Sequence, residues 1–300
     1  MAAMDFHGVF APVPTPFHRD ERLDLGRLGA ACARFAASPL SGLVVLGSTG
    51  EAVLLDEVES DRVVGVARQQ WPSGRPFIVG AGRESTAATI GAVRRAAELG
   101  ADAVLVRTPG FFKSQMTTDA FVRHYTAVAD RSPVPVLLYN FTAVTGVNLE
   151  PAAVSRLATH PNIAGVKESG ADMAQIADLV AGTPGDFSVL AGSATTFHSA
   201  LGVGAAGGVL ALACVLPDAC VRLFELTRTG RQADAGALQH RLAAVARLVG
   251  SMHGVPGLKA AMHLVGCDVG VPRSPLAPVS EATLAVLREA LVSFEEVALV

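Results

Sequence analysis

Residues 163–170 read IAGVKESG, a short apolar run that ends in Lys167 and then turns through Ser169 and Gly170. Such a run is typical of a buried strand, and the Ser-Gly pair turns the chain towards a helix. An ammonium group at the buried end of a strand is unfavourable unless it is paired or neutral. Burial lowers the pKa of a lysine, and a neutral amine is a nucleophile. Lys167 is therefore a candidate for amine chemistry, and the alternative is a strand-end lysine that reaches solvent.

Lysine is rare in this chain. Of the 24 lysines and arginines, only Lys113, Lys167 and Lys259 are lysines. Arginine stays charged and cannot form an imine. In a chain so biased towards arginine, a lysine at a strand end is a candidate where the chemistry needs an amine.

The alternation of short apolar runs with helical segments continues on both sides of this stretch. Eight strand signals, each followed by a helix, predict an α/β fold that closes into a (β/α)8 TIM barrel. An open doubly wound sheet is the weaker alternative, because Arg83 and Glu84 break the nearest match to a GxGxxG turn. The predicted strands are 9–13, 42–46, 77–79, 103–106, 134–139, 163–167, 187–190 and 208–212. The predicted helices between them are 25–37, 56–70, 86–99, 118–130, 151–158, 172–180 and 194–202.

The chain continues well past the eighth strand. A barrel needs one more helix there, whereas the pattern predicts helices at about 217–229, 231–251, 257–265 and 280–297. We therefore divide the chain into a catalytic barrel, residues 1–215, and C-terminal helices packed on it, residues 216–300. We interpret this helical extension as a subunit contact.

Composition excludes several classes of protein. Half of the 300 residues are hydrophobic, 17% are charged and the formal net charge is −3, which suits a compact soluble domain without a nucleic-acid footprint. No apolar run of membrane-spanning length is present, and Met1–Gly8 does not read as a secretory signal. Histidines, carboxylates and cysteines form no metal-like cluster. We read the four cysteines as core thiols of a cytoplasmic protein: Cys32, Cys214, Cys220 and Cys267.

In a barrel, chemistry is expected where strands end, and Lys167 and Tyr139 end neighbouring strands. An imine mechanism needs a proton carrier beside the lysine, and a phenol can serve. Tyr139 could equally be a core tyrosine. The only other tyrosine, Tyr125, falls on a predicted helix and is read as a core residue with its hydroxyl at the rim.

A second polar strand end is the turn Gly47-Ser48-Thr49-Gly50. Successive backbone N–H groups in such a turn can form an anion site for a carboxylate or phosphate. The alternative is an ordinary strand-to-helix turn. Glu51, just beyond it, is read only as a residue that orients the turn.

Together these stretches resemble the dihydrodipicolinate synthase / N-acetylneuraminate lyase family, the class I pyruvate aldolases. GSTGE at 47–51 is similar to the family's carboxylate turn, and GVKES at 165–169 to its Schiff-base lysine segment. YN at 139–140 with TG at 145–146 resembles its YNxPxxTG segment, and AAGGV at 205–209 its strand-eight glycines. The matches run in order through nearly the whole chain.

The resemblance implies a role for each matched residue. Lys167 would condense with the ketone of a 2-oxo acid, and Tyr139 would relay protons with Ser48 as its hydroxyl partner. In the turn that begins at Gly47, the N–H groups of Ser48 and Thr49 would hold the carboxylate. The family also implies a barrel with C-terminal helices, often a homotetramer, that needs no metal or organic cofactor.

Departures from the family pattern bear on the substrate. The proline of YNxP is Thr142, and the arginine that grips the aldehyde's carboxylate in dihydrodipicolinate synthases is Val144. A valine cannot donate to a carboxylate. The tyrosine that those enzymes carry after strand four is also missing, because Gly110, Phe111 and Phe112 follow Thr108-Pro109. We therefore expect a shortened or water-mediated relay and a less polar distal pocket lined by Val144 and Phe112.

Segments at 160–163, 190–194 and 254–259 look closer to the 4-hydroxy-2-oxoglutarate aldolase branch of the family. By the same likeness, Ser169, Ser193 and Leu210 are expected to line the substrate pocket. The first hypothesis is thus a pyruvate-dependent lyase of 4-hydroxy-2-oxo acids or 2-keto-3-deoxy sugar acids. A dihydrodipicolinate synthase, or a dehydratase or hydratase-aldolase that uses the same imine, is the second. A barrel that binds 2-oxo acids without turnover is the third.

Overall fold

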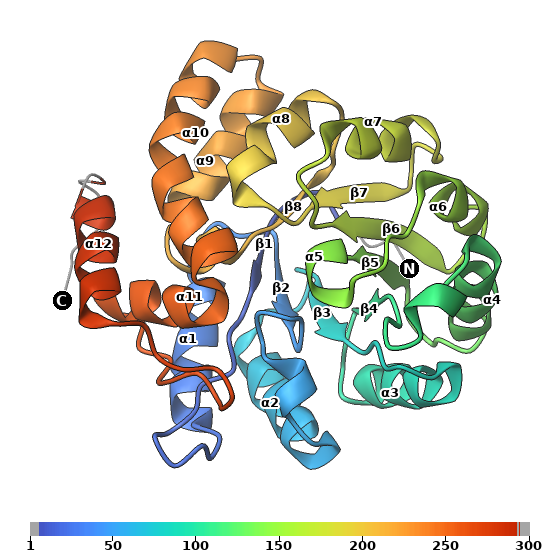
Figure 1. Cartoon of the computed structure of the whole chain (residues 1–300), viewed down its shortest axis with the longest axis horizontal. Helices are drawn as coiled ribbons and strands as arrows, with labels where there is room; N and C mark the ends of the chain where they lie inside the picture. The colour runs from blue at the N-terminus through green and yellow to red at the C-terminus, as the bar shows by residue number, and fades with distance from the viewer. Residues whose placement is uncertain (1–5, 293, 295–300) are drawn as a thin grey trace.

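The computed structural model describes residues 6–292 and residue 294, and it is a closed barrel of eight parallel strands hydrogen-bonded in sequence order. Figure 1 shows the strands in the middle, with helices around them. The predicted TIM barrel is confirmed. The strands are β1 (Gly8–Pro12), β2 (Gly42–Val45), β3 (Phe77–Gly80), β4 (Ala103–Arg107), β5 (Val136–Asn140), β6 (Ile163–Glu168), β7 (Ser188–Ala191) and β8 (Gly207–Val209).

Helices connect successive strands, and several begin where capping side chains predict. Asp56 and Glu59 form a reciprocal capping box at the start of α2, as their spacing predicts. Asp172 caps α7 by accepting from the backbone of the first turn. The helices of the barrel are α1 (Leu25–Ala36), α2 (Glu57–Gln70), α3 (Thr86–Glu98), α4 (Thr118–Ala129), α5 (Thr142–Thr145), α6 (Pro151–Leu157), α7 (Met173–Ala181) and α8 (Phe197–Gly202).

A helical extension follows β8, as predicted, and gathers on one side of the barrel (Figure 1). It contains α9 (Pro217–Arg228), α10 (Gln232–Arg247), α11 (Gly254–Leu264) and α12 (Glu281–Val292). The division at residue 215 stays a prediction. The predicted helix 280–297 is confirmed only as far as Val292, since its last residues lie largely outside the described part of the chain.

Three details differ from the sequence prediction. The segment 208–212 is not one strand, because β8 ends at Val209 and a 3-10 helix occupies Ala211–Cys214. The segment 231–251 is not one regular helix, because α10 gives way at Leu248–Met252 to a π-helix. The loop expected after β5 contains the short helix α5, which is too brief to show helical periodicity in the sequence.

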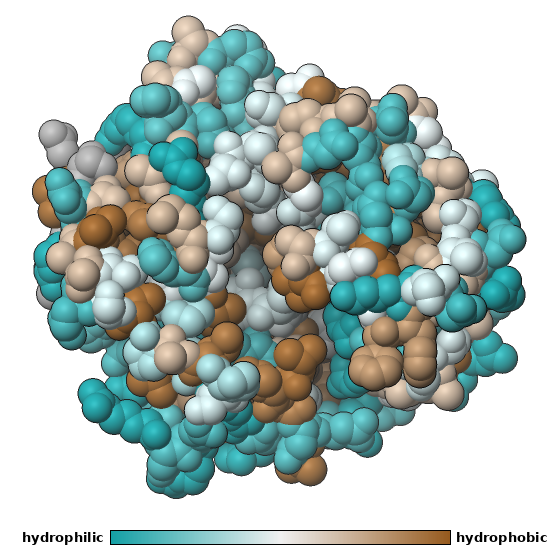
Figure 2. All heavy atoms as spheres, in the orientation of Figure 1, coloured by the Kyte–Doolittle hydropathy of each residue, from teal (hydrophilic) through white to brown (hydrophobic). Residues whose placement is uncertain are grey.

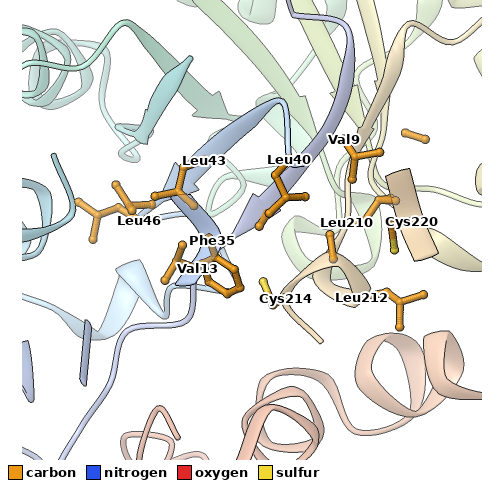
Figure 3. Close-up of a cluster of buried hydrophobic side chains, with 14 of the residues drawn as sticks. Val9, Val13, Phe35, Leu40, Leu43, Leu46, Leu210, Leu212, Cys214 and Cys220 are labelled. Carbon is orange, nitrogen blue, oxygen red and sulfur yellow. The ribbon is translucent and has the colours of Figure 1, made fainter. Parts of the chain in front are cut away.

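Two apolar clusters hold the barrel together. The inner one fills the barrel with side chains that include Phe10, Ile78 and Tyr139. The outer one lies between the strands and the helices, and Figure 3 shows part of it around Val9 and Leu43. Within the described residues, no helix is both long and apolar enough to cross a bilayer.

Candidate active site

Lys167 is the penultimate residue of β6 and lies inside the barrel. Only 4% of its surface is exposed, and the residue pairs in register with Tyr139 of β5. Its ammonium nitrogen lies 4.2 Å from the centre of the Tyr139 ring. The structure therefore brings together the lysine and the tyrosine that the sequence singled out, at the carboxyl end of the strands where barrel enzymes carry their chemistry.

The Tyr139 phenol contacts the turn that follows β2. Its oxygen lies 2.8 Å from the Ser48 hydroxyl oxygen, at hydrogen-bonding distance. The ring stacks on Phe141, with centroids 6.0 Å apart. Ser48 itself is exposed, so the hydrogen-bonded pair leads from the ring beside the buried lysine to solvent.

The turn at residues 47–50 presents free backbone donors. The N–H of Gly50 donates to the Gly47 carbonyl and the N–H of Glu51 to the Ser48 carbonyl. In the described part of the chain, the N–H groups of Ser48 and Thr49 have no protein acceptor. Two adjacent free donors beside a buried ammonium suit an anionic group such as the carboxylate of a 2-oxo acid.

The other predicted pocket residues are less closely grouped. Ser169 and Ser193 are half-buried on the loops after β6 and β7. Val144, on α5, is 63% exposed, and Phe112, on the loop after β4, is 68% exposed in the single chain. These two side chains therefore border the mouth of the barrel at the carboxyl ends of the strands and do not fill it. Figure 2 shows a hollow near the middle of this side of the molecule, which in Figure 1 lies between α5 and α11.

Leu210 does not join these residues. Its side chain is fully buried in the outer cluster, beside Val9 and Cys220 in Figure 3, and not in the inner cluster that contains Tyr139. The reason is that β8 ends at Val209, so Leu210 begins a 3-10 turn instead of continuing the alternation of a strand. Its side chain therefore packs towards the helices.

The sequence allows both tyrosines to be core residues, and the structure shows that their hydroxyl groups lie in different surroundings. Tyr125 is fully buried, and its hydroxyl donates to the Val106 carbonyl at 3.2 Å. Burial raises the pKa of this phenol well above its ordinary value. Tyr125 is thus a core tyrosine, as expected, whereas the hydroxyl of Tyr139 is hydrogen-bonded to the exposed Ser48.

The four cysteines are buried and unpaired, which confirms them as core thiols. Burial raises their pKa values and disfavours the thiolate form. Among the described residues, no group of three or more histidine, cysteine or acidic side chains is arranged to hold a metal ion.

A buried carboxylate, Glu168, is a site feature to which the sequence assigned no role. It accepts hydrogen bonds from the side-chain amides of Asn140 at 2.7 Å and Gln175 at 2.8 Å, and from the N–H of Gly170 at 2.6 Å. Asn140 pairs with Glu168 in the sheet register, one position after Tyr139 and Lys167. These bonds fix the ends of β5 and β6 against each other, and the adjacency of Glu168 to Lys167 was the only signal in the sequence.

A second feature that the sequence missed lies behind the turn. Glu51 is fully buried, and its carboxylate lies 2.6 Å from the ammonium of Lys259 on α11. The sequence separates these two residues by most of the chain, and no local pattern predicts their contact.

Comparisons with known proteins agree with this geometry. Residues 5–293 match the Dihydrodipicolinate synthetase family. A 4-hydroxy-tetrahydrodipicolinate synthase of Exiguobacterium sp. is 36% identical over 294 residues, which cover 97% of this chain and 99% of that protein. A probable mitochondrial 4-hydroxy-2-oxoglutarate aldolase of Emericella nidulans is 35% identical, with 94% and 93% covered.

Among solved structures, YagE of E. coli, a member of the dihydrodipicolinic acid synthase family in complex with pyruvate, superposes with a TM-score of 0.90. It is 28% identical, and the match covers 97% of this chain and 99% of that one. The chain therefore belongs to the dihydrodipicolinate synthetase family and is a carbon–carbon lyase.

Proposed function

We propose that the protein is a class I pyruvate aldolase that cleaves or forms 4-hydroxy-2-oxo acids or 2-keto-3-deoxy sugar acids through an imine on Lys167. The observation that carries the proposal is the cluster of a buried lysine, a phenol over which it lies, and two free backbone donors in the adjacent turn. A relative of known structure is described in complex with pyruvate, which supports pyruvate as the 2-oxo acid.

The proposed chemistry balances with these groups alone. The Lys167 amine adds to the C2 ketone and water leaves, so that an iminium ion forms next to the bound carboxylate. A base then removes the proton of the 4-hydroxyl, the C3–C4 bond breaks, and its electron pair flows into the iminium to give an enamine and a free aldehyde. Protonation at C3 and hydrolysis release pyruvate and regenerate the amine.

Tyr139 is placed to move the protons of these steps. Its ring lies 4.2 Å from the Lys167 ammonium, and its hydroxyl shares a hydrogen bond with Ser48. Ser48 is exposed, so the proton path is short and ends at solvent. This arrangement supports a water-mediated relay in place of the tyrosine that is missing after Thr108-Pro109.

The aldehyde portion of the substrate is proposed to be neutral. Val144 and Phe112 border the mouth, and neither can donate a hydrogen bond to a carboxylate. A dihydrodipicolinate synthase is the second candidate, because curated relatives such as that of Exiguobacterium sp. carry that name. A panel of aspartate semialdehyde, glyoxylate, glycolaldehyde and glyceraldehyde separates the two. Condensation of pyruvate with aspartate semialdehyde would indicate the synthase, whereas a preference for glycolaldehyde and glyceraldehyde over both carboxylated aldehydes would support an aldolase of neutral aldehydes.

We also propose that the protein is a cytoplasmic homo-oligomer, a dimer or tetramer. Four large apolar side chains are exposed on the loops after β2 and β4 and on α2, and burial of such surface favours association: Val53, Val58, Phe111 and Phe112. The rings of Phe111 and Phe112 lie 5.0 Å apart and offer one aromatic patch. Light scattering of a Phe111→Ser/Phe112→Ser variant tests the proposal, and an unchanged mass would remove these residues from any subunit contact.

The central experiment is borohydride trapping with pyruvate, followed by intact mass and peptide mapping. A pyruvate-sized adduct on Lys167 is the expected result. An adduct on another residue, or none from a folded protein, would contradict the imine mechanism. Aldehyde release from the substrate panel then distinguishes an aldolase from a barrel that only binds 2-oxo acids.

A further inference from the structure

A buried ion pair connects the carboxylate-binding turn to the C-terminal helices. Glu51 directly follows the turn, Lys259 belongs to α11, and each is only 2% exposed. Their charged atoms lie 2.6 Å apart. A pair buried this completely is stable only when further polar contacts satisfy both partners.

Those further contacts are present on the lysine. The Lys259 ammonium donates to the Thr15 carbonyl at 2.7 Å and to the Val271 carbonyl at 2.8 Å. The Glu51 carboxylate is the ion-pair partner of the same ammonium, so two hydrogen-bonded carbonyls and one carboxylate surround it. Burial lowers the pKa of Lys259, and Glu51 opposes that shift. The surroundings thus hold Lys259 as a charged anchor and not as a free nucleophile.

The contacts of Glu51 complete the connection. Its second carboxylate oxygen accepts the backbone N–H of Arg273 at 2.9 Å, so both oxygens contact the segment beyond β8. Thr15, which accepts from Lys259, also donates its hydroxyl to the Gly50 carbonyl at 2.6 Å. The turn is therefore held at Gly50 and at Glu51 by a single cluster.

The turn needs such support. Leu46 and Glu51 border it on either side, and both have left-handed backbones, with φ of 56° and 54°. This conformation is unfavourable for residues with a Cβ and persists only where the surroundings impose it. Between them, the free N–H groups of Ser48 and Thr49 must point the same way to bind one carboxylate.

We propose that Lys259 is a positioning residue for the 2-oxo acid: acting through Glu51, it holds the turn so that the Ser48 and Thr49 amides meet the substrate's carboxylate. The inference rests on the proposed function and adds to it that the C-terminal helices complete the donor site. It predicts a defect in binding of the carboxylate, with little effect on the aldehyde.

Two variants test the role of the pair. Lys259→Met keeps most of the side-chain volume and removes the charge, and Glu51→Gln keeps the shape of the carboxylate side chain. The readout is the concentration dependence of borohydride trapping on Lys167, with pyruvate and with methyl pyruvate, whose ester carries no charge. We expect the half-saturating pyruvate concentration to rise about tenfold to a hundredfold, the range for losing charge-assisted hydrogen bonds. For methyl pyruvate we expect a change of less than about threefold.

A matched control comes from another contact between the barrel and the C-terminal segment. Arg27 of α1 pairs with Asp268 at 2.9 Å. Arg27→Met is expected to leave trapping with both ketones unchanged, which separates the Lys259 effect from a general loosening of the C-terminal segment.

The outcomes are distinct. If the wild-type protein gives no adduct on Lys167, the proposed function fails. If wild-type trapping succeeds but both variants show unaltered pyruvate dependence, the inference alone is wrong. Equal losses for pyruvate and methyl pyruvate would also overturn it, because they would indicate general damage to the site. Should Lys259→Met not fold, the near-isosteric Glu51→Gln decides by the same criteria.

Discussion

Replacing Tyr139 by phenylalanine removes one oxygen from the site and leaves the rest of the side chain. The ring would keep its contact with the Lys167 ammonium, now at 4.2 Å, and its stacking on Phe141. Among the described residues, the phenol has one hydrogen bond to lose, that of 2.8 Å to Ser48, which is exposed and can bond to water instead. Tyr139→Phe therefore tests the phenol as a proton carrier with little disturbance of the lysine.

Two magnitudes follow. One neutral hydrogen bond contributes about 1 kcal/mol to stability, and less where solvent replaces it. Loss of a general acid–base group lowers turnover by about 10²–10⁴, which raises the barrier by roughly 3–5 kcal/mol. The catalytic loss is thus expected to exceed the loss of stability several-fold.

The assay is exchange of the pyruvate methyl protons with deuterated water, followed by NMR, because exchange needs the imine and the proton carrier but no aldehyde. Tyr125→Phe is the matched control, since it removes the only other phenol, a buried one that donates to Val106. We expect Tyr125→Phe to lower stability and leave exchange near the wild-type rate. Exchange by Tyr139→Phe within tenfold of wild type, or an equal loss in Tyr125→Phe, would refute Tyr139 as the proton carrier.

Three further outcomes are expected. Lys167→Ala should give no adduct and no turnover while keeping the wild-type melting temperature, whereas Lys113→Ala, at an exposed position, should still be trapped on Lys167; an adduct in the first variant would locate the imine elsewhere. Val144→Arg should raise kcat/KM for glyoxylate relative to glycolaldehyde by about tenfold, the effect of one charge-assisted hydrogen bond, and an unchanged ratio would mean that position 144 does not face the acceptor. Burial lowers the pKa of His124 to about 4, so between pH 6.5 and 4 the unfolded state binds the extra proton and stability falls as pH falls. The loss is on the order of 3 kcal/mol at pH 4, and urea unfolding at pH 7 and pH 4.5 should show a smaller pH dependence in His124→Asn; an equal dependence would exclude His124 as its source.

The barrel was predictable because each strand is a short apolar run followed by a turn. The same runs placed Lys167 and Tyr139 near the ends of their strands. The short helix α5 was not, since four residues such as Thr142–Thr145 complete little more than one turn. The role expected for Leu210 depended on β8 continuing, but the backbone turns into a 3-10 helix directly after Val209. Sequence periodicity carries no information about such a local change of backbone.

The rarity of lysine singled out Lys167, but the same reasoning applies equally to Lys113 and Lys259. What separates the three is their surroundings. Lys113 is exposed, Lys259 is enclosed by two carbonyls and a carboxylate, and Lys167 lies over an aromatic ring beside a turn with free donors. Lys259 is committed to a buried carboxylate as its ion-pair partner, whereas Lys167 lies against an aromatic ring beside donors that suit a substrate carboxylate. The different roles proposed for the two buried lysines, imine formation for Lys167 and positioning for Lys259, thus depend on long-range contacts. The sequence could identify lysine as the kind of residue needed, but only the fold distinguishes the two.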